Sequence, residues 1–194
     1  ALDVLAGKKI FHYGSITMIS EPARSATLAA VTAAQERGML ISYDPNLRLS
    51  LWPDAGAARA GMLAGLDAAN VLKISDEELE FMTGGHDVTP LWRPQLKLIT
   101  ITHGARGATA YTPNGQKVHV PGFSVRPVDT TGAGDGFVAG LLVSLLEYGD
   151  GYADRLDSVL RFANAVGALS TTQYGAIPAL PSRAAVDAFL QSAS

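Results

Sequence analysis

The chain has 194 residues, of which 47% are hydrophobic and 17% charged, and a chain of this kind can bury a core without disulfide bonds. It contains no cysteine, which excludes a disulfide scaffold and a thiolate metal site. The net charge of −3 includes no long run of like charges, so nucleic acid and anionic membranes, which need a concentrated basic face, are not expected as partners.

The first half of the chain alternates between segments that resemble strands and segments that resemble helices. Short β-branched and aromatic runs predict strands, and apolar residues three or four apart predict helices. In chain order, we predict a strand at 9–13, a helix at 21–37, a strand at 39–43, a helix at 55–66, a strand at 70–74, a short helix after Ser75 and a strand at 96–102. Strands alternating with helices of this length indicate a parallel sheet covered on both faces.

The second half begins with a predicted β-hairpin. Residues 108–112 and 117–120 flank Pro113-Asn114-Gly115, a turn-forming sequence. Three further helices are predicted, at 133–148, 154–173 and 182–192. No repeat, linker or signal peptide stands out, and the most apolar stretch is too short to span a bilayer. One α/β sandwich over residues 1–194 is the simple interpretation.

The segment DTTGAGDGFVAG, residues 129–140, carries the strongest functional signal. Its second half has the apolar spacing of a helix, so Gly132, Ala133, Gly134 and Asp135 lie where unpaired backbone N–H groups and the positive end of the helix dipole gather. Such a terminus binds anions. An aspartate there repels a bound phosphate, but it is useful if it deprotonates a hydroxyl while the N–H groups stabilise charge on a transferring phosphoryl group.

Two other interpretations apply to the same segment. Asp135 could be an ordinary first-turn acid favoured by the helix dipole, worth about 0.3–1 kcal/mol, and the motif alone does not separate the two roles. A dinucleotide-binding fingerprint does not fit, because Phe137 occupies the position of its third glycine. A dinucleotide oxidoreductase is therefore disfavoured, and no Walker-type GxxxxGK[ST] sequence is present.

DTTGAGDGFVAG resembles the C-terminal signature of the ribokinase-like (pfkB-type) carbohydrate kinases, whose core is D-T-x-G-A-G-D. The resemblance implies an α/β fold, a three-layer α/β/α sandwich with a mostly parallel sheet. It also implies that Asp135 is the catalytic base and that Gly132, Ala133 and Gly134 form the anion hole. Asp129 would help to hold a monovalent cation such as K⁺.

Further segments agree with the same family and imply an ATP site. THGARG, residues 102–107, is similar to the family's T-x-G-x-x-G turn, which would place Thr102, Gly104 and Gly107 near the ATP phosphates. FANAVGAL at 162–169 and YGAIP at 174–178 match the segments that surround adenine. Asn164 and Gly175 would belong to the nucleotide site, although small residues equally suit close helix packing, which the residues alone favour.

SDEE, residues 75–78, occupies the place of the family's N-x-x-E element, which supports Mg²⁺ and its waters. Glu78 matches and becomes a metal candidate acting through water, whereas Ser75 replaces the asparagine. Glu78 also has a competing structural role. Ser75 followed by Glu78 three positions later is a capping box at a helix start.

YDPNLRLSLWP, residues 43–53, follows a predicted strand and should lie at the ligand-binding edge of the sheet. Asp44, Asn46 and Arg48 alternate and are expected to share one side of an extended turn as substrate-binding residues. Arg48 could grip a phosphate or a polar substrate bidentately. DPNLRxxLW together with HYGSI, residues 12–16, most resembles fructokinases, and 2-keto-3-deoxygluconate kinases share DPN-x-R and are the alternative.

The resemblance covers the whole chain but only the middle and C-terminal parts of the family. The family's first strands, its N-terminal sugar-binding acids and its β lid have no counterpart. We therefore expect a cytoplasmic fragment of an ATP- and Mg²⁺-dependent kinase that converts fructose to fructose 6-phosphate, inactive alone and homodimeric in the full-length parent. A non-catalytic nucleotide-binding remnant is the alternative from another functional class.

Overall fold

The computed structural model describes residues 2–193, which divide into two compact units. The first unit contains the described residues up to Ile101 together with Thr112–Gly115. The second contains Thr102–Tyr111 and the described residues from Gln116 onward. Each of the functional segments found in the sequence can be assigned to one of these units.

The strands of the first unit follow the order of the chain. β1 (Ile10–Gly14) pairs in parallel with β2 (Leu40–Asp44) over its whole length, and β2 pairs in parallel with β3 (Val71–Ser75). β4 (Leu98–Thr102) follows β3 in the sheet. Because β1, β2 and β3 run in the same direction, their carboxyl ends meet at one edge, which is where the polar residues after β2 lie.

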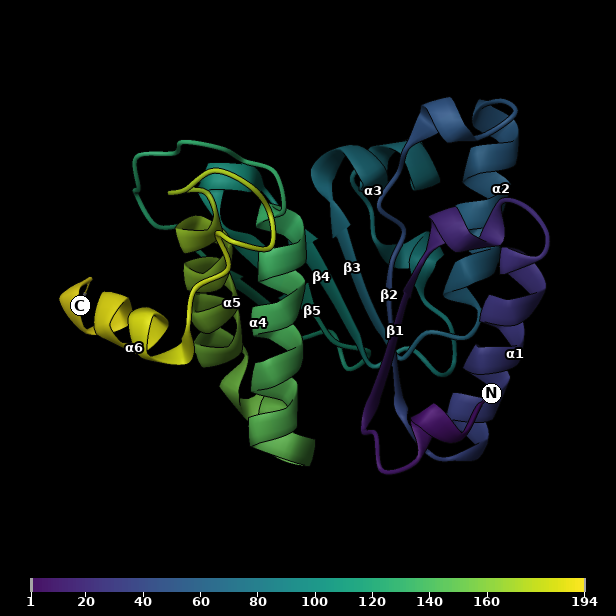
Figure 1. Cartoon of the computed structure of the whole chain (residues 1–194), viewed down its shortest axis with the longest axis horizontal. Coiled ribbons are helices and arrows are strands. Elements are labelled where there is room, and N and C mark those ends of the chain that lie inside the picture. The colour runs from purple at the N-terminus through teal and green to yellow at the C-terminus, as the bar shows by residue number, and fades with distance from the viewer. Residues whose placement is uncertain (1, 194) are drawn as a thin grey trace. The chain divides into compact units, whose positions relative to one another are not determined.

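Helices join these strands, as a parallel arrangement requires. α1 (Ala23–Glu36) packs on β1 and β2, while α2 (Ala55–Leu66) contacts α3 (Asp76–Thr83) (Figure 1). β2 and β3 are buried along almost their whole length, which explains their continuous apolar sequences. Short 3₁₀ helices occupy Leu2–Leu5, Ser15–Met18, Leu49–Leu51 and Thr89–Leu91 in this unit, and Gly104–Arg106 and Gly149–Arg155 in the second.

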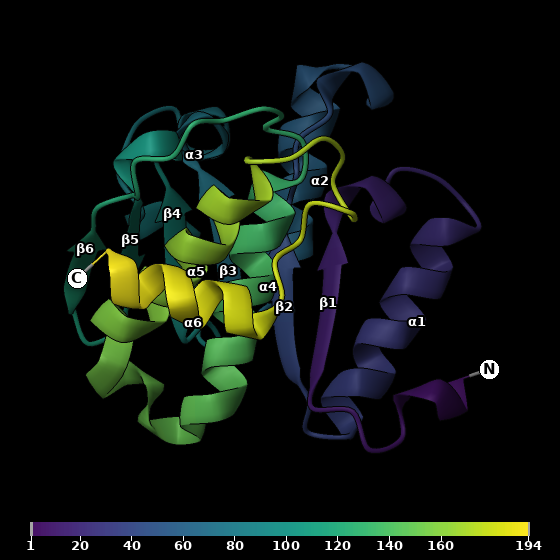
Figure 2. The same cartoon turned by 60° about the vertical axis from the view of Figure 1, so that its left-hand side comes forward.

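The second unit combines a hairpin with three helices. β5 (Ala108–Tyr111) and β6 (Lys117–Val120) are antiparallel, and α5 (Leu156–Ser170) packs on them. α4 (Ala133–Tyr148) runs along α5, and α6 (Arg183–Ser192) packs on the other side of α5 (Figures 1 and 2).

Glycines allow α4 and α5 to lie very close together. A Cβ atom added to Gly140 would be 2.9 Å from the Cα of Ala163, and one added to Gly136 would collide with the hydroxyl of Ser170. The glycine-rich sequence after Asp135 therefore has a packing role in its own right.

Several predicted boundaries need correction. The helices at 55–66 and 133–148 and the strand at 117–120 are confirmed. The strand predicted at 96–102 begins at Leu98, and the one predicted at 108–112 ends at Tyr111. The strands predicted at 9–13, 39–43 and 70–74 each begin and end one residue later. The helix expected from 154 starts at Leu156, because the preceding residues form a 3₁₀ helix. The helix predicted at 21–37 runs from Ala23 to Glu36, with Pro22 as its N-cap.

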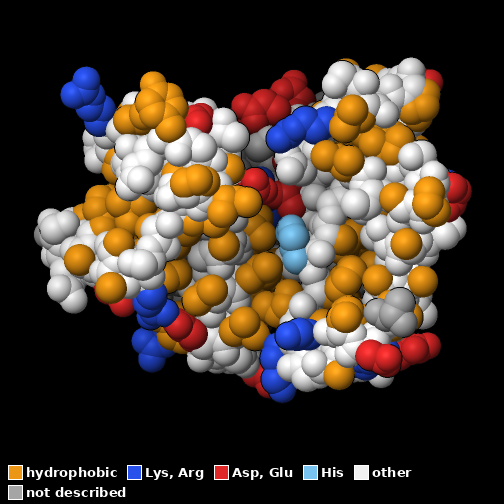
Figure 3. Space-filling model, viewed as in Figure 1, with side chains coloured by type: hydrophobic (Ala, Val, Ile, Leu, Met, Phe, Trp, Pro, Cys, Tyr) orange, Lys and Arg blue, Asp and Glu red, His pale blue; other side chains and the backbone are white. Residues whose placement is uncertain are grey.

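The face of the molecule drawn in Figure 3 carries side chains of every kind. On the face shown in Figure 3, Lys and Arg side chains are scattered among acidic and apolar ones rather than gathered in one patch. Among residues 2–193, none of the helices has the length and apolar character needed to cross a bilayer.

Candidate active site

The second unit contains a cavity of about 580 Å³, within the ordinary range for small-molecule sites. Six of the residues predicted for the site line this cavity. These are Thr102, Gly104, Gly107, Ala133, Gly134 and Asn164. The structure therefore brings together the predicted phosphate turn, the start of α4 and part of α5, which are far apart in the sequence.

The turn after β4 forms one wall of this cavity. The backbone N–H of His103 donates to the carbonyl of Gly107 (2.8 Å), which closes the turn. Gly104 and Gly107 both have positive φ, 59° and 101°. A Cβ on Gly107 would collide with the Val120 carbonyl, so this position requires glycine for space as well as for backbone geometry.

The N-terminus of α4 forms a second wall. Gly132 is the N-cap in the left-handed region (φ 80°), and a Cβ there would be 2.8 Å from the Cβ of Ala176. Ala133 and Gly134 follow in the first helical turn and line the cavity. The N–H of Ala133 donates to the carbonyl of Thr130 (3.2 Å). The other N–H groups of a first turn have no preceding turn to bond, so this wall offers donors and a positive dipole end to an anion.

Asp135 lies in the first turn of α4, adjacent to the cavity-lining Gly134, and it is exposed. The carboxylate does not itself line the cavity. It is therefore available to a molecule that approaches from outside while another group occupies the cavity. Its catalytic role, like the anion-hole role of Gly132, Ala133 and Gly134, stays a prediction.

Asp129 connects two loops near the start of α4. Its two carboxylate oxygens accept the backbone N–H groups of Thr131 (2.9 Å) and Gly175 (3.0 Å). These hydrogen bonds hold the pKa of Asp129 below its ordinary value, and the bond from Thr131 has the larger effect. Asp129 is thus an ionised group that fixes the loop of Gly175, and its binding of a monovalent cation remains a prediction.

The α5 wall combines the predicted adenine segment with residues that sequence reasoning missed. The Nδ2 of Asn164 donates to the carbonyls of Val120 (3.1 Å) and Pro121 (3.2 Å), so this buried amide fixes the loop that follows β6. That loop supplies missed lining residues, namely Gly122, Phe123, Ser124, Val125 and Pro127. Only its position directly after the hairpin could have indicated them.

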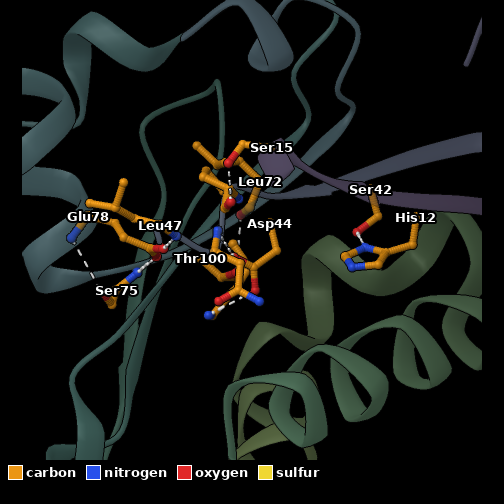
Figure 4. Close-up of polar contacts among 12 residues, drawn as sticks. His12, Ser15, Ser42, Asp44, Leu47, Leu72, Ser75, Glu78 and Thr100 are labelled. Carbon is orange, nitrogen blue, oxygen red and sulfur yellow. Dashed lines mark hydrogen bonds and ion pairs between the residues drawn. The ribbon is translucent and has the colours of Figure 1, made fainter. Parts of the chain in front are cut away.

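The first unit contains a separate polar group at the end of β2, shown in Figure 4. The Nζ of Lys73 lies 3.0 Å from Oδ2 of Asp44, and both side chains are buried. Burial raises the pKa of Asp44 to about 6; Lys73 opposes this shift and Glu78 adds to it. Sequence reasoning missed Lys73, although a lone lysine inside the apolar strand VLKIS was a usable signal.

Glu78 has two structural partners. Its Oε2 accepts the backbone N–H of Ser75 (2.8 Å) while Ser75 Oγ accepts the N–H of Glu78 (3.2 Å), which confirms the capping box. Its Oε1 accepts the backbone N–H of Leu47 (2.7 Å). Within residues 2–193, no cluster of three or more His, Asp or Glu side chains is arranged to hold a metal. The metal role of Glu78 stays a prediction.

The expected extended turn after β2 is not observed. Asn46 has a φ of 48°, in the left-handed region, so the backbone is not extended at this residue. Asp44 is buried, whereas Arg48 is exposed and its Nη1 donates to the Leu47 carbonyl (3.0 Å). Substrate contacts by Asp44, Asn46 and Arg48 remain predictions.

Comparison with known proteins identifies the family. The model of the pfkB family carbohydrate kinases matches residues 2–183. This chain belongs to the pfkB family of carbohydrate kinases. The predicted fold class, a ribokinase-like α/β fold, is confirmed by its structural relatives.

Similar members of the pfkB family include plant fructokinases. Fructokinase-2 of Solanum habrochaites is 49% identical over 189 residues, covering 93% of this chain and 57% of the relative. Fructokinase-2 of Oryza sativa subsp. japonica is 47% identical over 200 residues, covering all of this chain and 59% of the relative. The chain therefore spans somewhat more than half the length of these relatives.

Solved structures of pfkB-family kinases resemble the chain closely. A double mutant of the Vibrio cholerae O395 fructokinase, with fructose, ADP and potassium ion bound, superposes with a TM-score of 0.86 at 37% identity, covering 98% of this chain and 64% of that one. A fructokinase from Xylella fastidiosa with bound ATP gives a TM-score of 0.87 at 32% identity, covering 95% and 62%.

Proposed function

We propose that this chain is the nucleotide-binding and phosphoryl-transfer portion of a kinase that converts fructose and ATP to fructose 6-phosphate and ADP. One observation carries the proposal: the first turn of α4 lines a cavity through Ala133 and Gly134 while presenting the exposed carboxylate of Asp135. An anion-binding terminus and a general base are thereby adjacent in one helical turn.

The residues divide the chemistry between them. The N–H groups at Gly132–Gly134 and the helix dipole stabilise negative charge that grows on the transferring phosphoryl group. The carboxylate of Asp135 accepts the proton of the attacking hydroxyl. The turn at Gly104 and Gly107 and the α5 residues Asn164 and Ala168 hold the nucleotide within the cavity.

The residues present fit a nucleotide because the cavity is bordered by glycine and alanine at its turn, at α4 and at α5. A bound Mg²⁺ would neutralise phosphate charge, and Glu78 would act on it through water, since Mg²⁺ keeps most of its waters. Asp129 would contribute to a K⁺ site through those carboxylate lone pairs that do not accept the two backbone hydrogen bonds.

Fructose is the proposed sugar because relatives named fructokinase are 49% and 47% identical to this chain. The solved Vibrio cholerae relative was obtained with fructose. Arg48 would grip the substrate from the segment after β2. A 2-keto-3-deoxygluconate kinase is the alternative, and substrate comparison in the assay below separates the two.

We propose further that the whole protein acts in the cytoplasm as a homodimer and does not bind nucleic acid. The net charge of −3 supports the last point, because nucleic acid attracts proteins with a concentrated basic surface. One Arabidopsis thaliana relative, 48% identical over 197 residues, is named as chloroplastic, so the compartment needs direct localisation.

Calorimetric titration with ATP tests the nucleotide site, and coupled ADP release with fructose tests turnover. We expect the chain to bind ATP, and Asp135→Asn to bind it equally well. We also expect negligible turnover without the remaining 40% or so of the relatives' length. Failure to bind ATP at millimolar concentration would overturn the nucleotide site, and rapid turnover by this chain alone would show that the missing part is dispensable.

A further inference from the structure

Side chains, rather than strand pairing, hold the backbone that follows β2. The carbonyl of Pro45 accepts both the N–H (3.3 Å) and the Oγ (2.6 Å) of Ser15. The N–H of Asn46 donates to Oδ1 of Asp44 (3.0 Å), and the N–H of Leu47 donates to Oε1 of Glu78 (2.7 Å). Three successive residues are thus fixed by groups from three different elements, as Figure 4 shows in part.

Two of these acceptors are buried carboxylates. Asp44 is 5% exposed and Glu78 is 8% exposed, so water competes little for their oxygens. Hydrogen bonds to ionised acceptors are roughly twice as strong as those between neutral groups. Lys73, 7% exposed, bonds the second oxygen of Asp44 and thereby fixes the plane of the carboxylate that receives Asn46.

The backbone of this segment needs such support. Asn46 has a φ of 48°, in the left-handed region, which asparagine enters more readily than most non-glycine residues but not in preference to extended backbone. A conformation of this kind persists where the surroundings over-determine it. Without the acceptors at Asp44 and Glu78, the segment would relax toward extended backbone and Arg48 would leave its present position.

We propose that Lys73 and Glu78 are positioning residues that hold residues 45–48 in the conformation that presents Arg48. This inference rests on the proposed function for the identity of the molecule that Arg48 receives. The link to Arg48 is direct: its Nη1 donates to the carbonyl of Leu47, the residue whose N–H is held by Glu78.

The positioning role of Glu78 is distinct from its helix-capping role, because each role uses a different carboxylate oxygen. The capping box needs only Oε2, which accepts from Ser75, whereas Oε1 serves Leu47 in a segment 31 positions away. Glu77, the preceding residue on α3, is exposed and supplies a matched control. Glu78→Ala and Glu77→Ala remove the same charge from the same helical turn.

Site-resolved amide exchange, measured by NMR on this chain without ligands, tests the positioning role. In Glu78→Ala we expect the Leu47 amide to exchange about 10–100 times faster, the range for losing a charge-assisted bond. In Lys73→Met the Asn46 amide should respond, and in Glu77→Ala neither should. If Glu78→Ala does not fold, Glu78→Gln serves, because an amide side chain can accept at only one of its two ends. Unchanged exchange at Leu47 and Asn46 would overturn the proposal.

Inorganic phosphate is an anion that Arg48 can bind. Titration with it tests whether the backbone conformation held by Glu78 is needed for anion binding by Arg48. We expect Arg48→Ala and Glu78→Ala to weaken phosphate binding by a similar factor, and the double variant to show no further loss, because both changes act through one guanidinium. Phosphate binding that persists in Arg48→Ala is assigned to the first turn of α4, so only the part that depends on Arg48 is compared. Additive losses in that part, or no part that depends on Arg48, would overturn the link. A chain that fails to bind ATP would defeat the proposed function while leaving the exchange result intact.

Discussion

The Nζ of Lys73 lies 3.0 Å from Oδ2 of Asp44, and the pair is buried between the neighbouring parallel strands β3 and β2. Removing one member of a buried pair leaves an uncompensated charge, which costs far more than the pair contributes. The raised pKa of Asp44, about 6, makes this cost depend on pH.

Lys73→Met should lower the free energy of unfolding by about 3–5 kcal/mol at pH 8, because Asp44 is then ionised without its cation. The loss should be smaller at pH 5. Without Lys73, which lowers the pKa of Asp44, that carboxyl takes up a proton more readily and becomes neutral. Urea unfolding at the two pH values measures the difference, with Lys8→Met at an exposed position as control. An equal loss at both pH values would contradict the charge argument.

Asp44 should also make wild-type stability fall as pH rises from about 4 to about 6. Its folded pKa, about 6, lies above its ordinary value of 3.8, so the native state holds a proton that the unfolded chain has released. This contribution is present below pH 4 and is lost as pH passes 6. Relative to Asp44→Asn, which does not titrate, the wild type should lose up to about 3 kcal/mol over this window. A constant difference between the two proteins would refute the assignment.

Gly140→Ala should destabilise the second unit by about 1–2 kcal/mol, because overpacking between α4 and α5 outweighs the better helix propensity of alanine. The new Cβ would be 2.9 Å from Ala163 and 3.0 Å from the Cγ2 of Val166. Gly85→Ala, where nothing lies within 4 Å, is the control and should be nearly neutral. Thermal unfolding of both variants provides the measurement.

Ala168→Leu should weaken ATP binding by about tenfold or more, equivalent to about 1.4 kcal/mol, because the added atoms enter the cavity. Stability should change little, since Ala168 is half-buried and lines the cavity. Ala139→Leu, on the exposed face of α4, adds the same atoms outside the cavity and should leave binding unchanged. Equal affinity in Ala168→Leu would mean that the nucleotide binds elsewhere.

Local sequence patterns predicted those features that local forces determine. The capping box of Ser75 and Glu78 and the N-terminus of α4 at Gly132 could be predicted because their groups lie within four residues of one another. The strands were displaced by about one residue because their ends depend on pairing partners far away, as in the alignment of Ile10 with Leu40.

The polar group around Asp44 could not be predicted in the same way. Lys73 and Asp44 are 29 positions apart and meet only because β2 and β3 are adjacent. The bend at Asn46 also escaped prediction. Asparagine enters the left-handed region more readily than most non-glycine residues, but it is equally compatible with other backbone conformations, so its presence alone does not predict a bend. The resemblance to carbohydrate kinases identified residues 43–53 as a functional segment, but it did not reveal which atoms hold the backbone of that segment in place.

Both tryptophans of the chain, Trp52 and Trp92, belong to the first compact unit. Intrinsic fluorescence excited at the indole band therefore reports on that unit alone, whereas far-ultraviolet circular dichroism is dominated by helices from both. If the two signals change at different urea concentrations, the units melt as separate cooperative blocks. Coincident curves would show that the two units unfold in a single transition, despite the boundary between them near Ile101.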